Sequence, residues 1–90
     1  MFSWDEGKRS RNLHRHGIDF ADAAKVFDGF TVTAEDTRYE YGEQRFLTLG
    51  FLNGEVISVT HTERGEEVRI ISMRKATNHE TKHYFSQIPD

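Results

Sequence analysis

The stretch that decides the fold is "RFLTLGFLNGEVISVTHTERGEEVRIIS", residues 45–72. Two runs in it, residues 45–51 and 55–62, are rich in β-branched and large apolar side chains. The pair Asn53-Gly54 between them is a strong signal for a tight hairpin turn. A third β-rich run, residues 68–72, follows another glycine-containing turn. The stretch therefore predicts an antiparallel β-meander.

The segment before the meander predicts one strand and two helices. Residues 2–4 alternate apolar and polar side chains, as a short strand does. Asp5 is a favourable N-cap for a helix over residues 6–16, and Gly17 suits a left-handed exit from it. A second helix starts at Asp19, and its expected buried stripe has helical spacing: Phe20, Ala23, Ala24 and Phe27.

The remaining segments complete an α+β fold. Residues 31–33 are β-branched, and the acidic stretch 34–44 has the composition of an exposed loop. Thr77 and Glu80 have the spacing of a capping box, which predicts a C-terminal helix. The predicted order is a strand, two helices, an antiparallel meander of three to four strands and a C-terminal helix, in a single domain over residues 1–90.

Composition excludes several classes of protein. The chain has no cysteine, which excludes disulfides, thiolate metal sites and a cysteine nucleophile. No apolar run approaches a membrane span, and the N-terminus lacks the apolar core of a signal peptide, so we expect a soluble cytoplasmic protein. The net charge is −3, but a locally basic face is compatible with an acidic average.

One motif suggests zinc. "HETKH", residues 79–83, matches the H-E-x-x-H pattern of zinc peptidases. A zinc peptidase needs a third protein ligand, and only seven residues follow His83, although His14 and His16 are free in principle to supply one. Glu80 already has a capping role in the predicted helix. Two histidines on a helix surface are therefore the favoured interpretation, and a zinc site is the minor one.

A second constellation indicates an RNA-binding face. His61, Glu63 and Arg64 lie at the end of one predicted strand and in the turn after it, and further cations follow at Arg69, Arg74 and Lys75. Arginine donates bidentately to phosphate oxygens, so a sheet face with these groups suits an RNA backbone. A mixed, solvated surface is the simpler alternative.

Strand alternation predicts which side of the sheet two of these residues occupy. His61 shares the side of its strand with Ile57 and Val59, which is also typical of a buried core histidine. By the same alternation Arg69 shares the side of Ile71 and Met73, where a purely solvated residue is not expected.

Two long segments carry a resemblance to a known family. "WDEGKRSRNLHRHGIDFADAAKVF" (4–27) and "GEQRFLTLGFLNGEVISVTHTERGEEVRIISMRKATNHETKHY" (42–84) resemble the BrnT toxins in the order and spacing of W-D, G-E-x-R, H-T-x-R and R-I-I-S-x-R-K-A. His79 and His83 lie outside the family pattern, and Met73 replaces a small residue there.

The resemblance implies a RelE-like fold, RNA cleavage that arrests growth, and neutralisation by a BrnA-like ribbon-helix-helix antitoxin. DNA would be bound only indirectly, through the antitoxin complex. No cofactor, metal or membrane partner is implied. Lys8 and His16 are weaker candidates for the site, and capping and packing suit Glu80 and Tyr84. The site residues that the resemblance implies are His61, Arg64, Arg69 and Arg74 as catalytic groups and Lys8 and Lys75 as RNA-binding groups.

The hypothesis that follows is a metal-independent endoribonuclease in which the 2′-hydroxyl of the RNA attacks. The arginines would neutralise the phosphate, and His61, with an ordinary pKa near 6.5, would transfer a proton. Glu63 or Lys75 would supply the other half of the acid–base pair. The alternative is a non-catalytic module that only binds its antitoxin within a promoter-repressing complex.

Overall fold

A computed structural model describes residues 1–89 of the chain. Its elements, in chain order, are β1 (Phe2–Trp4), α1 (Glu6–His16), the short 3₁₀ helix η1 (Phe20–Asp22), α2 (Ala23–Asp28), β2 (Thr31–Glu35), β3 (Phe46–Leu52), β4 (Glu55–Arg64), β5 (Glu67–Lys75) and α3 (Asn78–Gln87). The predicted α+β class and element order are confirmed. None of the described helices has the length and apolar character needed to cross a membrane.

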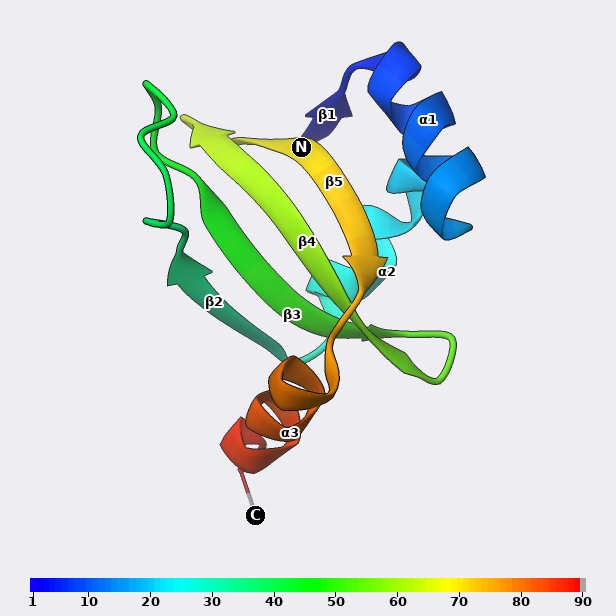
Figure 1. Cartoon of the computed structure of the whole chain (residues 1–90), viewed down its shortest axis with the longest axis vertical. Coiled ribbons are helices and arrows are strands. Elements are labelled where there is room, and N and C mark those ends of the chain that lie inside the picture. Colours follow the sequence, from blue (N-terminus) through cyan, green and yellow to red (C-terminus); the bar gives the residue numbers. More distant parts are fainter. Residues whose placement is uncertain (90) are drawn as a thin grey trace.

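The strands form one five-stranded sheet in the order β1-β5-β4-β3-β2 (Figure 1). Strands β2 to β5 form the predicted antiparallel meander. Strand β1 joins the same sheet and pairs parallel with β5, so the sheet is mixed. This pairing brings the start of α1 beside the middle of β5.

Local signals predicted the turns and caps correctly. Asn53 and Gly54 have φ values of 50° and 85° at the β3–β4 turn, which is the left-handed pair of a tight hairpin. The Asp5 side chain accepts a hydrogen bond from Lys8 N, and Gly17 ends α1 at φ 71°. Thr77 and Glu80 form the predicted capping box of α3.

One face of the sheet packs on η1 and α2. Phe20, Ala23 and Val26 are fully buried there against Val59 and Met73. The predicted stripe was wrong in one member, since Ala24 is exposed. The segment begins as the 3₁₀ helix η1, in which residues three apart lie on one side, so Ala23 rather than Ala24 follows Phe20 on the buried side. Val26 lies one turn further along α2 and is also buried.

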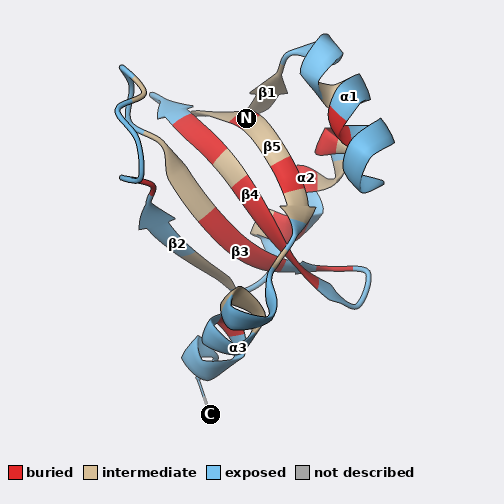
Figure 2. Ribbon diagram, in the orientation of Figure 1, coloured by how far each residue is buried: buried red, intermediate tan, exposed pale blue. Residues whose placement is uncertain are grey.

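The opposite face is covered only in part. Tyr84 of α3 packs with Leu49 and Val56, and its hydroxyl donates a hydrogen bond of 2.8 Å to the Phe30 carbonyl. Figure 1 shows α3 across the lower end of the sheet, and Figure 2 shows the buried residues along the central strands. We call the rest of this side, away from α3, the open face.

A β-bulge reverses the alternation along β5. Thr60 pairs with Ser72, but His61 pairs with Ile70, so Ile71 is an extra residue. Met73 and Ile70 therefore both point into the core, and Arg69 pairs with Thr62 on the open face. The simple alternation that grouped Arg69 with Met73 was wrong for this reason.

The acidic stretch 34–44 is only partly an exposed loop. Strand β2 continues to Glu35, and Asp36 is buried. The Asp36 carboxylate accepts hydrogen bonds from Arg38 Nε at 2.8 Å and from Tyr41 Oη at 3.2 Å. The loop is thus folded around a buried carboxylate, which composition alone did not indicate.

Candidate functional site

A cleft of about 150 Å³ lies where β4 ends and β5 begins, beside the start of α1. In Figure 1 the end of β4 and the start of β5 lie at the upper part of the sheet, near the loop that joins β2 to β3. We call it the basic cleft. Its lining residues come from the start of α1, the loop that joins β2 to β3, and the β4–β5 hairpin, three parts of the chain that are far apart in sequence: Asp5, Lys8, Glu43, Arg45, Thr62, Arg64, Arg69, Ile70 and Ile71.

Positive charge dominates the basic cleft. Arg45 and Arg64 share one carboxylate, because Glu43 lies 3.3 Å from Arg45 Nε and 3.7 Å from Arg64 Nη2. Within residues 1–89, Lys8 and Arg69 form no ion pair with an acidic side chain. The cleft lining thus holds four cationic side chains and two carboxylates, Asp5 and Glu43, and this excess of positive charge suits a polyanion.

The second carboxylate in the cleft, Asp5, is held by the backbone. It accepts a hydrogen bond of 2.9 Å from Lys8 N, and this bond lowers the pKa of Asp5. Capping the helix thus places the Lys8 side chain, one turn along α1, at the edge of the cleft.

A basic groove of about 310 Å³ continues from the cleft along α1 and shares Lys8 and Ile71 with it. Arg11, Arg15 and His16 also line this groove. Asn12 at its base is buried and exchanges hydrogen bonds with the backbone of Met73, at 2.9 Å and 3.1 Å. Asn12 thereby fixes α1 against β5 and holds the cleft and the groove side by side.

Arg74 lies on the open face but does not line the cleft. Its guanidinium makes two hydrogen bonds to the Glu80 carboxylate, of 2.8 Å and 3.0 Å. These bonds lower the pKa of Glu80 to about 2, so the pair is ionic at neutral pH. A cation just before a helix is unfavourable by itself, and the first-turn Glu80 compensates it.

Lys75 lies at the other end of β5 from the cleft. Its ammonium group is 3.3 Å from the Glu55 carboxylate, and it lines a different groove, with Gly54 and Phe85. The structure therefore separates Lys75 from Lys8, the other residue predicted to bind RNA.

His61 lies on the core side of β4 and is 1% exposed. Its ring is stacked with Phe46 and forms a T-shaped pair with Phe27, at centroid distances of 5.7 Å and 5.3 Å. Nε2 hydrogen-bonds Thr48 Oγ1 at 2.8 Å, and Nδ1 has no partner within residues 1–89. Burial lowers the pKa of His61. The structure thus places this imidazole on the opposite side of the sheet from Arg64 and Arg69.

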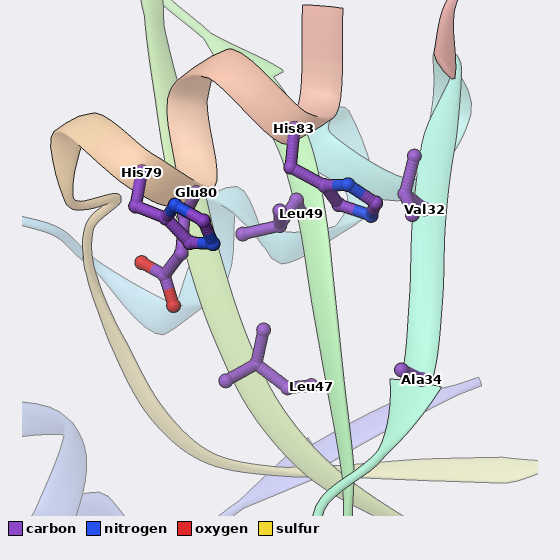
Figure 3. Close-up of a pocket in the computed structure, with 7 residues that line it drawn as sticks. All are labelled: Val32, Ala34, Leu47, Leu49, His79, Glu80 and His83. Carbon is purple, nitrogen blue, oxygen red and sulfur yellow. The ribbon is translucent and has the colours of Figure 1, made fainter. Parts of the chain in front are cut away.

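The HETKH motif lines a separate pocket of about 280 Å³ (Figure 3). His79 and His83 extend from α3 toward Leu47, Leu49 and Val32. The Glu80 oxygens are engaged by Arg74 and by the Thr77 amide, as the capping interpretation predicts. Within residues 1–89 no group of three or more potential ligands is placed to hold a metal ion.

Of the residues predicted from the sequence, the structure brings Lys8, Arg64 and Arg69 together in the cleft. Two residues there, Glu43 and Arg45, were not singled out as site residues. A signal was present, because both belong to the G-E-x-R motif of residues 42–45. Nothing local indicated that this motif lies opposite the β4–β5 turn.

A small α+β protein with a cationic cleft on an open sheet face fits the class of proteins that bind polyanions. Residues 4–80 match the model of a family described as the ribonuclease toxin BrnT of type II toxin–antitoxin systems. The chain belongs to this BrnT family. That description implies RNA as the substrate and an antitoxin as the partner. Among curated proteins, none matches the chain.

Proposed function

We propose that this protein is a metal-independent endoribonuclease that cleaves RNA in the basic cleft and arrests growth in the bacterial cytoplasm. A BrnA-like ribbon-helix-helix antitoxin neutralises it, and DNA is bound only through that complex. The observation that carries the proposal is the convergence of Lys8, Arg45, Arg64 and Arg69 on one cleft, two of them without an acidic partner within residues 1–89.

The cations hold and neutralise the scissile phosphate. Arg69 is free to bind its non-bridging oxygens, and a guanidinium can do so with two parallel hydrogen bonds. Negative charge grows on these oxygens as the phosphorane forms. Fixed positive charges then stabilise the transition state more than the ground state.

The reaction needs two proton transfers. The 2′-oxygen of the RNA attacks phosphorus and forms the O2′–P bond, while its proton passes to the Glu43 carboxylate. The P–O5′ bond breaks, and the Lys8 ammonium donates a proton to the leaving 5′-oxygen. The products are a 2′,3′-cyclic phosphate and a 5′-hydroxyl. Glu43 and Lys8 are chosen because both line the cleft, whereas His61 is buried on the other side of the sheet.

The other site residues predicted from the sequence do not line the basic cleft. Arg74 lies on the same open face and positions α3 through Glu80. Lys75 would meet only RNA that extends beyond the cleft to the far end of β5. The proton-transfer role of His61 remains a prediction from the sequence, and the variant His61→Phe tests it.

The test is cleavage of single-stranded RNA by the purified chain in EDTA. We expect 2′,3′-cyclic phosphate ends, and no cut at a position where the 2′-hydroxyl is replaced by hydrogen. Arg69→Ala should lower kcat/KM by about 100-fold or more, because it removes a preorganised charge from the phosphate. Lys82→Ala, which removes an exposed cation from α3, should leave kcat/KM unchanged.

Antitoxin binding distinguishes the enzyme from a docking module. Arg69→Ala should bind the antitoxin as the natural chain does and should no longer arrest growth. A natural chain that is harmless when expressed alone, binds the antitoxin and leaves RNA intact would overturn the enzymatic proposal in favour of the module.

A further inference from the structure

The loop that joins β2 to β3 presents an exposed aromatic ring close to the basic cleft. The Tyr39 residue is 71% exposed, the highest value among the large aromatic side chains that are exposed in the described chain. Its ring packs against Tyr41 in an edge-to-face arrangement, with a centroid distance of 5.8 Å and an interplanar angle of 71°. One partner therefore supports the ring while most of its surface faces solvent.

The loop that carries Tyr39 is anchored by polar contacts. The buried Asp36 carboxylate binds Arg38 at 2.8 Å and 2.9 Å and the Tyr41 hydroxyl at 3.2 Å. The bond to Arg38 holds the pKa of Asp36 at about 2, so the carboxylate is charged at neutral pH. A charged carboxylate therefore holds the loop through Arg38 and Tyr41, which precede and follow Tyr39 in the sequence.

The ends of the loop are tied to the sheet. Asp36 N donates to the Arg45 carbonyl at 2.8 Å, and Thr62 Oγ1 donates to the Gln44 carbonyl at 2.8 Å. Thr62 is itself part of the cleft lining. These bonds hold the loop in a defined place relative to the cleft.

A chain of contacts connects Tyr39 to the cleft. The Arg45 guanidinium carbon lies 4.1 Å from the centre of the Tyr41 ring, a cation–π contact. Arg45 lines the cleft, and Tyr41 packs on Tyr39. The exposed ring is thus separated from a cleft cation by one aromatic side chain.

We propose that Tyr39 is a stacking platform for an unpaired base of single-stranded RNA whose neighbouring phosphate lies in the basic cleft; this inference rests on the proposed function. Proteins that bind single strands combine a cationic groove with exposed aromatic rings on which bases stack. Bases in a duplex are already stacked and cannot turn onto the ring. The structure therefore assigns single-stranded RNA, rather than duplex RNA, as the substrate class.

The test measures the affinity for an RNA that cannot be cleaved because the 2′-hydroxyl at the scissile position is replaced by hydrogen. Tyr39→Ala should weaken binding of the single strand about tenfold, while Tyr39→Phe should restore it. An abasic nucleotide next to the scissile position should weaken binding to the natural chain and have little further effect on Tyr39→Ala. Phe85→Ala, which removes a half-exposed ring from α3, is the control and should not change the affinity.

The outcomes separate this inference from the proposed function. Unchanged affinity of Tyr39→Ala, with cleavage by the natural chain intact, would overturn the platform and leave the nuclease proposal standing. Loss of antitoxin binding by Tyr39→Ala without loss of RNA affinity would also overturn it, because the ring would then belong to a protein interface. A natural chain that neither binds nor cleaves RNA would overturn both.

Discussion

Neighbouring residues on β4 lie in opposite environments. His61 is enclosed by Phe27 and Phe46 on the core side, and Thr62 lines the basic cleft on the other side. Alternation along a strand produces this separation over one residue. Although His61 is next to Thr62 in the sequence, its side chain lies on the opposite face of the sheet from the basic cleft. Substitution of His61 is therefore expected to affect the stability of the fold before it affects RNA cleavage.

His61 should make stability depend on pH. Burial lowers the pKa of folded His61 below the ordinary 6.5, so the unfolded chain binds this proton more readily than the folded one as pH falls. The contribution of neutral His61 is complete above about pH 6.5 and is lost below it, with a slope of at most about 1.4 kcal/mol per pH unit. Urea unfolding between pH 8 and pH 5 should show this slope, and His61→Phe should lack it.

The same variant tests the proton-transfer role predicted from the sequence. A folded His61→Phe that cleaves RNA within severalfold of the natural chain would assign His61 to the core. A folded variant that loses as much kcat/KM as Arg69→Ala would support catalysis and contradict the assignment of proton transfer to Glu43 and Lys8.

At the scale of elements, α3 is attached to the sheet by a polar pair as well as by Tyr84. Glu80 closes the capping box with the Thr77 amide at 2.9 Å and also binds Arg74. One carboxylate thus caps the N-terminus of α3 and also joins α3 to β5. The Arg74 and Glu80 side chains are 33% and 21% exposed, so solvent weakens the contribution of their ion pair.

Glu80→Gln should destabilise the fold by about 1 to 2 kcal/mol at pH 7, through weakening of the cap and of the ion pair. The folded pKa of Glu80 is about 2 against an ordinary 4.5, so this stability is present above about pH 4.5 and is lost as pH falls toward 2. Urea unfolding should show a difference between the two proteins that shrinks from pH 5 to pH 3. A difference independent of pH would rule out the ionic contribution.

The contact between α2 and β3 depends on a glycine. A Cβ added at Gly50 would lie 2.5 Å from Cγ1 of Val26 and 3.1 Å from its carbonyl oxygen. Close approach of helix and strand, rather than a special backbone angle, requires glycine here.

Gly50→Ala should therefore destabilise the protein by about 1 to 3 kcal/mol, because α2 must move away from the sheet. Gly29→Ala is the matched control, since an added Cβ there meets nothing within 4 Å, and it should cost less than about 0.5 kcal/mol. Urea unfolding of both variants gives the comparison. Equal free energies of unfolding for the two variants would show that α2 can move away from the sheet without loss of stability.

At the scale of the whole molecule, charge is distributed unevenly. The net charge is −3, yet cations dominate the basic cleft and continue along the α1 groove through Arg11 and Arg15. A local basic surface on an acidic protein attracts RNA only where the cations converge. Binding should therefore depend on salt in proportion to a small number of phosphates.

We expect log Kobs for uncleavable single-stranded RNA to fall with log salt at a slope of about −2 to −3.5, from about 0.7 for each of three to five phosphates. Arg11→Ala should reduce the magnitude of the slope by about 0.7, since Arg11 lines the groove that extends the cleft. Fluorescence anisotropy at several salt concentrations measures the slope. A slope that Arg11→Ala and Lys82→Ala change equally would exclude an RNA path along α1.

The sequence by itself determined the type and order of the elements of this protein, the N-terminal caps of α1 and α3 and the tight turn between β3 and β4. Helix caps and hairpin turns act on backbone groups a few residues away, so they can be predicted from the nearby sequence. This holds here for Asp5, Gly17, Thr77 and the pair Asn53-Gly54. The hydrophobic runs likewise determined the meander, because alternation acts along one strand. The family could also be recognised from motif order, and the family model matches residues 4–80.

Only the tertiary structure decided which side chains share a site. The parallel pairing of β1 with β5 brings Lys8 to Arg69, and the bulge opposite Thr60 and His61 turns Arg69 to the open face. Arg74 meets Glu80, and Arg45 joins the cleft, through contacts between separate segments. A one-residue register change moves a side chain from one face of a sheet to the other, and that register depends on packing between elements that are distant in the sequence.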